Sequence, residues 1–191
     1  ELTEIYKGNK QVTVLPFDLS LPVEAQLKEH FTGITEVHGL INNAGYLEQG
    51  ATETLSIEAY HRCMQTNFFG PVALIQWLFP RLNAGKAHVV NISTMGAFQG
   101  SVKFPGLSAY AASKAAITNF TEVFAEEQKD TGIRMNCLCL GAVNTEMLRD
   151  AFPGYVAPVS AEEMGAYIAE FTLRSGLVFN GKILPVSSST P

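Results

Sequence analysis

The sequence predicts an α/β fold in which a doubly wound parallel sheet lies between two layers of helices, giving three layers in all. β-rich runs alternate with segments of helical periodicity along the 191 residues, and this order is typical of βαβ crossovers. Small and polar residues follow several of the runs, at the strand ends where such sheets bind their ligands. We expect residues 1–191 to form a single domain.

The first part of the chain predicts two strands. Residues 1–6 resemble the end of a helix, and the β-rich run 12–17 precedes Asp18. Residues 22–31 follow with helical spacing and a proline suited to the first turn. The apolar run 37–41 is the second strand, and the turn-forming residues after it allow a ligand to come close. These residues are Asn42, Asn43, Ala44 and Gly45.

Residues 56–82 predict one long helix, with Ser56 as its cap and the pair Gly70-Pro71 inside it. Proline has no N–H to donate to the carbonyl four residues earlier, which is that of Asn67. We therefore expect a break in the helical hydrogen bonding at Asn67.

The second part of the chain continues the alternation. Three strands are predicted over 88–93, 134–140 and 181–186. A loop over 96–107 and a helix over 110–130, which Gly132 ends, separate the first two of these strands. A long connection over 141–159 and a helix over 160–174, which begins with a capping box of Ser160 and Glu163, precede the last strand. A polar tail follows it.

Composition excludes several kinds of partner. The net charge is −5 and no lysines or arginines cluster, so neither nucleic acid nor an acidic membrane is an expected partner. The longest apolar run, 68–79, is broken and too short to span a bilayer. The odd count of cysteines (Cys63, Cys137, Cys139) predicts reduced thiols in the cytoplasm, and no metal site is expected.

A phenol and an amine one helical turn apart are the strongest candidates for chemistry. Tyr110 and Lys114 open the predicted helix 110–130 and share a face, with small residues crowded around them. The pattern Tyr-x-x-x-Lys alone is weak, because a pair on the protein surface would look the same. Its position opposite several strand ends favours a role in a site.

The order of the motifs resembles that of the short-chain dehydrogenases/reductases, in their single-domain branch. The motifs are Asn42-Asn43-Ala44-Gly45, Asn67, Asn91-Ile92-Ser93-Thr94, Tyr110-x-x-x-Lys114 and Asn136-x-x-x-x-Gly141-x-x-x-Thr145. The resemblance covers residues 18–186 and implies a Rossmann-like fold. It also implies an NAD(P)-dependent oxidoreductase that interconverts an alcohol and a ketone, with NAD or NADP as its cofactor.

The resemblance implies roles for the catalytic residues. Tyr110 would be the acid/base, and the ammonium of Lys114 would lower its pKa from about 10 toward neutrality and bind the nicotinamide ribose. A hydroxyl at the end of strand 88–93 would orient the substrate oxygen. We favour Thr94 over Ser93, and strand alternation allows only one of them to serve. The main-chain carbonyl of Asn67 would hold a water that links to Lys114.

The remaining residues implied by the resemblance bind the cofactor. Asp18 would meet the adenine amine, and Val143 and Thr145 the carboxamide of the nicotinamide. The full set of expected cofactor contacts is Asp18, Asn42, Ala44, Gly45, Tyr110, Lys114, Val143 and Thr145.

Three departures from the family pattern affect these expectations. Thr94 stands where the family serine usually is, with Ser93 before it. Leu140 stands where a proline usually precedes Gly141. The glycine-rich phosphate loop, a Thr-Gly-x-x-x-Gly-x-Gly pattern, is absent, and with it a cradle for the pyrophosphate. We expect the first βαβ stretch of the domain to be missing, so that the domain is incomplete at its N-terminus. A catalytically inactive member of the same fold, acting as a binding or regulatory subunit, is therefore the alternative hypothesis.

Aromatic and aliphatic residues predict the substrate and the assembly. A small, partly apolar carbonyl or alcohol compound would suit the candidates for the substrate pocket, although core packing is an equally ordinary use for any one of them. These candidates are Phe98, Phe104, Met147, Leu148, Phe152 and Tyr155. The apolar helix over 68–79, together with the helix that opens at Tyr110, predicts a homodimer or homotetramer.

Overall fold

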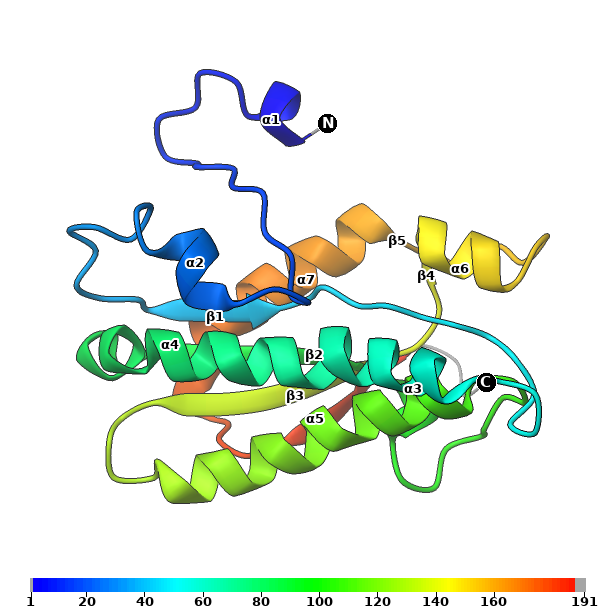
Figure 1. Ribbon diagram of the computed structural model, residues 1–191. Helices are drawn as coiled ribbons and strands as arrows, with labels where there is room; N and C mark the ends of the chain where they lie inside the picture. The colour runs from blue at the N-terminus through cyan, green and yellow to red at the C-terminus, as the bar shows by residue number, and fades with distance from the viewer. Residues whose placement is uncertain (1, 188–191) are drawn as a thin grey trace.

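The computed structural model describes residues 2–187 and contains a sheet of four parallel strands. The strands are β1 (Gly39–Asn42), β2 (His88–Thr94), β3 (Arg134–Leu140) and β6 (Ile183–Val186), in the spatial order β1-β2-β3-β6. Figure 1 shows the sheet in the middle of the molecule. The register sets Asn42 beside Asn91, and Asn91 beside Cys137. The predicted parallel sheet is confirmed.

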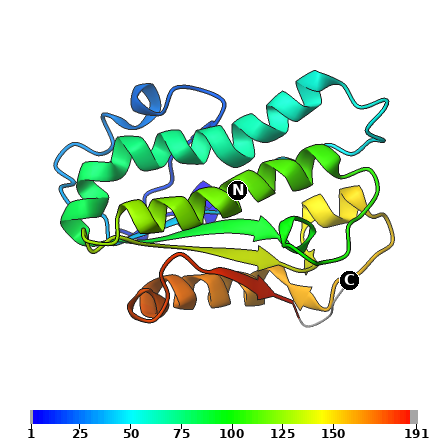
Figure 2. The same ribbon diagram turned by 90° about the horizontal axis from the view of Figure 1, so that it is seen from below.

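Helices cover both faces of the sheet, as predicted. One face carries α3 (Ile57–Met64), α4 (Gly70–Gly85) and α5 (Ser108–Glu127), and the other carries α7 (Ala161–Arg174). Figure 2 shows the resulting three layers, with α4 and α5 on one side of the strands and α7 on the opposite side. Two shorter helices, α1 (Leu2–Ile5) and α2 (Val23–Leu27), lie in the N-terminal part of the chain.

The core has one layer on each side of the sheet. Ile75, Leu82 and Phe124 pack with Val89 of β2 under α4 and α5. On the other face, Val90 of β2 packs with side chains that include those of Ile168 and Phe171 of α7. Because neighbouring residues of a strand point to opposite faces, a strand buried on both faces is apolar nearly throughout.

The long helix predicted over 56–82 is confirmed, and it contains a π-helical turn where the break was expected. Ser56 caps it by accepting a hydrogen bond from Ala59 N at 3.2 Å. The π-helical turn η1 (Gln65–Phe69) joins α3 to α4, and the N–H of Gly70 bonds to the carbonyl of Gln65, five residues back. Pro71 lies at the start of α4. Such turns occur frequently at functional sites.

The predicted strand over 12–17 is wrong. These residues are extended, but among the described residues no strand lies beside them to accept or donate ladder hydrogen bonds. The helix predicted over 22–31 is shorter than expected, ending at Leu27. Of the C-terminal tail, residues 188–191 lie outside the described part of the chain.

The connection over 141–159 contains three elements that the sequence did not predict. They are β4 (Val143–Asn144), α6 (Glu146–Ala151) and β5 (Val159–Ser160), and β4 pairs with β5 in a second small sheet. Short 3₁₀ turns, η2 (Met95–Ala97) and η3 (Ser175–Leu177), complete the fold. The capping box predicted at Ser160 and Glu163 is present at the start of α7. No helix in the described part of the chain is both long and apolar enough to cross a bilayer.

Candidate active site

A cavity of about 570 Å³ opens at the carboxyl ends of β2 and β3. This is the edge where parallel sheets bind ligands. Segments from five parts of the chain build it: the turn after β1, the end of β2, the loop before α5 together with its first turns, the end of β3, and α6. Its lining residues are Asn43, Gly45, Leu47, Ile92, Ser93, Thr94, Met95, Gly96, Phe104, Leu107, Tyr110, Lys114, Leu140, Gly141, Ala142, Val143, Thr145, Met147, Leu148, Ala151, Phe152 and Tyr155.

Tyr110 and Lys114 both line this cavity, one turn apart on α5. Lys114 is only 3% exposed, and its Nζ donates a hydrogen bond of 2.9 Å to the carbonyl of Ile92 in β2. Among the described lining residues it is the one side chain that is ionic at neutral pH. The cavity therefore contains a single fixed positive charge beside a phenol.

Burial shifts the pKa values of both groups, and for Tyr110 the direction is opposite to the expected one. Burial, with a smaller electrostatic contribution from Cys63, raises the pKa of Tyr110 to about 12. Burial lowers the pKa of Lys114 to about 8. The expected lowering of the Tyr110 pKa by Lys114 is therefore not seen in this structure. Desolvation is the largest cause of the rise in the pKa of Tyr110, and the Lys114 ammonium donates to the Ile92 carbonyl.

The two hydroxyls at the end of β2 lie in different surroundings. Ser93 is 3% exposed, and its Oγ donates to the main-chain carbonyl of Lys114 at 3.0 Å. Thr94 is less buried, and its Oγ1 accepts a bond of 3.2 Å from Gly96 N. The Thr94 hydroxyl thus keeps its proton for another acceptor, whereas the Ser93 proton is already used to bind α5. Both residues line the cavity.

The side chain of Asn67 ties the turn after β1 to α5. Its Oδ1 accepts from Tyr46 N at 2.8 Å, and its Nδ2 donates to Tyr46 O and to Ser113 Oγ, both at 2.8 Å. Ser113 Oγ in turn donates to the carbonyl of Tyr110 at 2.8 Å. This chain of bonds connects Tyr46 to the residue that carries the phenol. Ser113 was missed from the sequence, although it directly precedes Lys114.

The expected cofactor contacts are only partly brought together. Gly45, Val143 and Thr145 line the cavity with Tyr110 and Lys114. At Gly45 the backbone comes so near Lys114 that an added Cβ would lie 3.4 Å from Nζ. Thr145 also caps α6 by accepting from Leu148 N at 3.3 Å.

Asn42, Ala44 and Asp18 are not among the cavity-lining residues. The amide of Asn42 donates instead to Asn91 Oδ1 at 2.8 Å, inside the sheet. Asn43, the next residue, lines the cavity in its place. Asp18 is exposed, and hydrogen bonding by the side chain and then the main chain of Ser20 lowers the pKa of its carboxyl; the bond from Ser20 N measures 2.8 Å.

The outer part of the cavity is apolar, and most of the expected substrate-pocket residues line it. Phe104 from the loop before α5 and Phe152 from the end of α6 meet edge to face, with 6.2 Å between ring centroids. Met147, Leu148 and Tyr155 also line the cavity. Phe98 does not, and packs instead against a buried cluster that contains Cys137 and Cys139.

Comparison with known proteins identifies the family. The model of the family described as short chain dehydrogenase matches residues 1–155. The chain belongs to the short-chain dehydrogenases. Human 11-beta-hydroxysteroid dehydrogenase type 2 is 35% identical over 136 residues, which is 71% of this chain and 32% of that protein. Rat dehydrogenase/reductase SDR family member 7B is 35% identical over 143 residues, covering 72% of this chain and 42% of the relative.

Other members show the same extent of match. Mouse estradiol 17-beta-dehydrogenase 2 is 31% identical over 146 residues, covering 73% of this chain and 37% of the relative. The chain thus spans about a third to two fifths of the length of these curated short-chain dehydrogenases.

Solved structures of short-chain dehydrogenases share the fold. A 3-ketoacyl-(acyl-carrier-protein) reductase from Brucella melitensis, complexed with NADH, superposes with a TM-score of 0.79 at 22% identity, covering 92% of this chain and 77% of that one. A 4-hydroxyisoleucine dehydrogenase mutant complexed with NADH and succinate gives a TM-score of 0.83 at 21% identity, with 99% and 83% covered. The predicted Rossmann-like fold is confirmed.

Proposed function

We propose that this short-chain dehydrogenase interconverts an uncharged, largely apolar alcohol and the corresponding ketone, with a nicotinamide cofactor. The single observation that carries the proposal is the position of Tyr110 and Lys114 in the wall of one cavity at the strand ends. A binding or regulatory subunit has no need of this arrangement, in which a buried ammonium carries a cost. The enzyme is therefore favoured over the inactive alternative.

Four residues would have separate roles in the reaction. The Tyr110 hydroxyl would give its proton to the ketone oxygen during reduction, or take it from the alcohol during oxidation. Lys114 would stabilise the tyrosinate that remains, because an ammonium favours a nearby anion. The Thr94 hydroxyl, which has a proton to donate, would orient the substrate oxygen and stabilise the charge that develops on it. The side chain of Asn67 would position Tyr46 and Ser113, and its main-chain carbonyl would hold the water that links to Lys114.

The residues present fit the nicotinamide and ribose part of NAD or NADP. Gly45 allows close approach beside Lys114, while Val143 and Thr145 face the same cavity. The cofactor, when bound, supplies or accepts the hydride. No residue is assigned to the pyrophosphate, because the sequence has no glycine-rich phosphate loop. Asp18 would meet the adenine amine, and Asn42 and Ala44 would line the cofactor outside this cavity.

The lining of the cavity supports the choice of an uncharged substrate. Apart from Lys114, the described lining residues carry no ionic side chain that could pair with a carboxylate, phosphate or amine of the substrate. A buried unpaired charge is costly, so a charged substrate would lose affinity. The cavity volume of about 570 Å³ lies in the ordinary range for small-molecule sites.

The first test replaces Tyr110 with phenylalanine. Oxidation of a cyclic secondary alcohol is followed by the absorbance of the reduced nicotinamide. We expect Tyr110→Phe to lower kcat by about 100-fold or more, the usual worth of a general acid/base. Tyr167→Phe is the matched control, because Tyr167 lies on α7 and is 44% exposed. Equal turnover by the parent and Tyr110→Phe proteins would refute the catalytic role.

A binding experiment separates the enzyme from the inactive alternative. Calorimetric titration with NADH and with NADPH should give saturable binding of at least one nucleotide. Lys114→Met should weaken this binding, because it removes the group proposed to bind the ribose. Absence of saturable binding to either nucleotide would favour the regulatory subunit.

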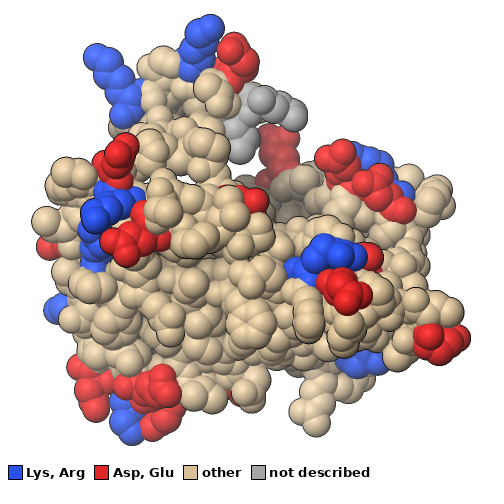
Figure 3. Space-filling model, in the orientation of Figure 1, with Lys and Arg blue, Asp and Glu red and all other residues tan. Residues whose placement is uncertain are grey.

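The proposal includes a homo-oligomer and a reducing compartment. Figure 3 shows a broad, mostly uncharged surface over α4 and α5, with acidic and basic side chains mainly around its margins. Phe69, in the π-helical turn before α4, is 52% exposed, and Val123 of α5 is 49% exposed. An apolar surface of this kind favours a second copy as its partner. The three cysteines are free and buried, which supports the cytoplasm as the compartment.

A further inference from the structure

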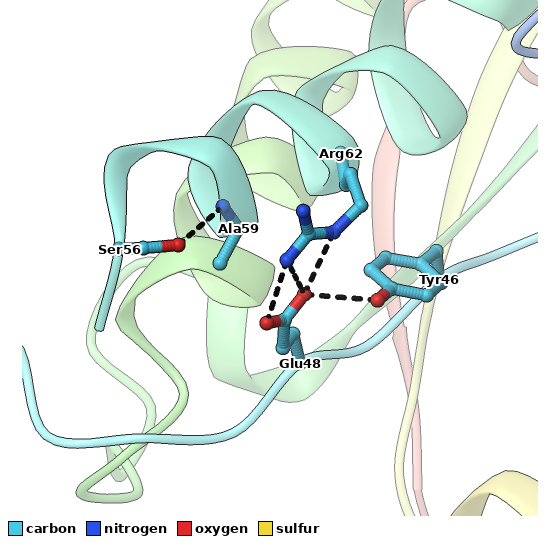
Figure 4. Close-up of polar contacts among 5 residues, drawn as sticks. All are labelled: Tyr46, Glu48, Ser56, Ala59 and Arg62. Atoms are coloured by element: carbon cyan, nitrogen blue, oxygen red, sulfur yellow. Dashed lines mark hydrogen bonds and ion pairs between the residues drawn. The ribbon is translucent and has the colours of Figure 1, made fainter.

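A polar cluster lies just outside the cavity, on the segment between β1 and α3. The Glu48 carboxylate accepts four hydrogen bonds: Arg62 Nη2 donates to Oε1 and to Oε2 at 2.8 Å, Arg62 Nε donates to Oε2 at 3.1 Å, and the Tyr46 hydroxyl donates to Oε2 at 2.9 Å. Figure 4 shows Glu48 between the two donors, with Arg62 reaching it from α3. These bonds lower the pKa of Glu48, so that it stays ionised.

The main chain of the same segment is also held at Tyr46. The side chain of Asn67 binds both the N–H and the carbonyl of Tyr46. Leu47 therefore lies between Tyr46, which is held through main chain and side chain, and Glu48, which is held through its side chain.

Leu47 forms a boundary between two hollows. On one side is the cavity that contains Tyr110 and Lys114. On the other side is a more polar hollow of about 480 Å³, lined by segment 45–49 and by α6 residues that include Glu146 and Asp150. Gly45, Leu47, Met147 and Ala151 line both. Leu47 is thus the large side chain that segment 45–49 contributes to the boundary between the two hollows.

We propose that the Glu48–Arg62–Tyr46 cluster is a positioning device that fixes Leu47 as the wall between the two hollows, and that this wall limits the size of the substrate. The fork of Arg62 suits this task because two N–H groups on one carboxylate fix direction as well as distance. The Tyr46 hydroxyl adds a third donor group to the same carboxylate, from the segment itself. The statement about substrate size rests on the proposed function, whereas the statement about position does not.

Hydrogen exchange tests the positioning without any need for turnover. Glu48→Gln keeps the shape of the side chain but removes the charge. We expect amide exchange in residues 45–49 to rise about two- to fivefold, the factor that corresponds to a surface ion pair, with no change elsewhere. The control is Glu24→Gln, which breaks the exposed pair of Glu24 and Lys28 (3.6 Å) on α2. Unchanged exchange in residues 45–49 would overturn the proposal.

A double variant tests whether the groups act together. If Arg62 acts through Glu48, the double variant Glu48→Gln/Arg62→Gln should exchange no faster than either single variant, because the shared interaction is lost only once. Arg62→Lys keeps the charge without the fork, and should give an intermediate rate. Additive effects of the two single variants would contradict a shared device.

Substrate preference tests the second half of the proposal. The probes are two uncharged ketones, cyclohexanone and the larger 2-decalone, with NADH and NADPH. Leu47→Ala and Glu48→Gln should both shift the ratio of kcat/KM toward 2-decalone, mainly through KM, and Glu24→Gln should leave the ratio unchanged. An unchanged ratio in both variants would refute the wall. If neither ketone were turned over, the proposed function would be in question, while the exchange result would still decide the positioning.

Discussion

Lys114 carries its charge into a part of the protein that excludes water. Burial lowers its pKa to about 8 from an ordinary value of 10.5. Below pH 8 Lys114 is charged in the folded protein, and the cost of burying this charge lowers the free energy of unfolding compared with a protein that has a neutral side chain at position 114. Between pH 8 and 10.5 the unfolded chain holds more protons than the folded one, and stability rises with pH in this window.

Replacement of Lys114 should therefore stabilise the fold while it removes function. We expect Lys114→Met to raise the free energy of unfolding by about 1–3 kcal/mol at pH 7, because the cost of the buried charge disappears. The bond to the Ile92 carbonyl is lost, which keeps the gain below the full cost of burial. Urea unfolding at pH 7 and pH 10 measures both the gain and the lost pH dependence. A less stable variant at pH 7 would show that the ammonium bond outweighs desolvation.

His88 gives the fold a sensitivity to acid. Its Nδ1 lies 2.9 Å from the carbonyl of Thr172, and its Nε2 lies 2.9 Å from the amide Nδ2 of Asn136. The carbonyl requires a proton on Nδ1, and the amide donor requires a lone pair on Nε2, so the ring must be neutral. Burial lowers the pKa of His88 accordingly.

The stability that depends on neutral His88 should be complete above pH 6.5 and lost as the pH falls below it. In that range His88 binds a proton in the unfolded chain but stays neutral in the folded chain. The measurement compares urea midpoints at pH 7.5 and 5.5 for the parent and for His88→Gln, which can replace both hydrogen bonds. We expect the parent to lose more stability than the variant. Equal losses would place the acid sensitivity at other groups.

At the residue scale, the sequence predicted that Tyr110 and Lys114 share one cavity, whereas only some of the expected cofactor contacts line it. The spacing of Tyr110 and Lys114 on one helix fixes their common face, so both reach the cavity. Whether Asn42 or Asn43 faces the cavity depends on the backbone conformation of the turn after β1, which the spacing of residues in the sequence does not show. The opposed pKa shifts of Tyr110 and Lys114 arise from burial by distant parts of the chain, which a sequence motif does not contain.

Two glycines in helices should respond in opposite ways to the same substitution. At Gly70 an added Cβ would lie 2.7 Å from Leu19 Cβ and 2.8 Å from Leu19 O, whereas at Gly165 of α7 nothing lies within 4 Å. We expect Gly70→Ala to destabilise the fold by about 1–3 kcal/mol through overpacking. Gly165→Ala should stabilise it by about 0.5–1 kcal/mol, since alanine is the better helix former.

Thermal or urea unfolding of both variants checks this prediction. The pair controls for the general effect of alanine in a helix, because only Gly70 contacts the segment before α2. A stabilised Gly70→Ala protein would mean that this segment moves aside without cost.

At the element scale, long periodic segments were predictable and short ones were not. The helix over 56–82, with its break near Asn67, follows from apolar periodicity and from Pro71. The six-residue helix α6 is too short for its periodicity to be recognised, and its cap, Thr145, was assigned to the cofactor instead. Yet α6 provides one side of the cavity, so the sequence analysis did not predict the helix that forms this side.

For the whole molecule, we expect the uncharged surface over α4 and α5 to join two copies of the chain. Val123→Glu would place a carboxylate on this surface, and burying it in an interface is costly. Sedimentation velocity should then show a shift toward the monomer. The control is Leu173→Glu, at a side chain that is 83% exposed on α7, on the other face of the sheet. A parent protein that is monomeric at micromolar concentration would contradict the oligomer.

The parallel direction of the strands was predictable because helices alternate with them along the chain. The strand expected over 12–17 was not formed, since a strand depends on a neighbour and not only on its own residues. The same dependence explains why the edges of the sheet are harder to predict than its centre, where β2 and β3 pair over seven residues each.

The π-helical turn η1 takes up one extra residue within an otherwise regular helix. Deletion of one residue within 65–69 would allow an ordinary α-helix there, and the parts of the helix before and after the turn would keep nearly the same relative direction, because a π-helical turn contains about one residue more than an α-helical turn. A deletion in the regular part of α4 would instead turn everything before it by about 100° around the helix axis, so that Arg62 would no longer face segment 45–49. A scan of single-residue deletions should therefore find η1 more tolerant than the regular helix that follows it.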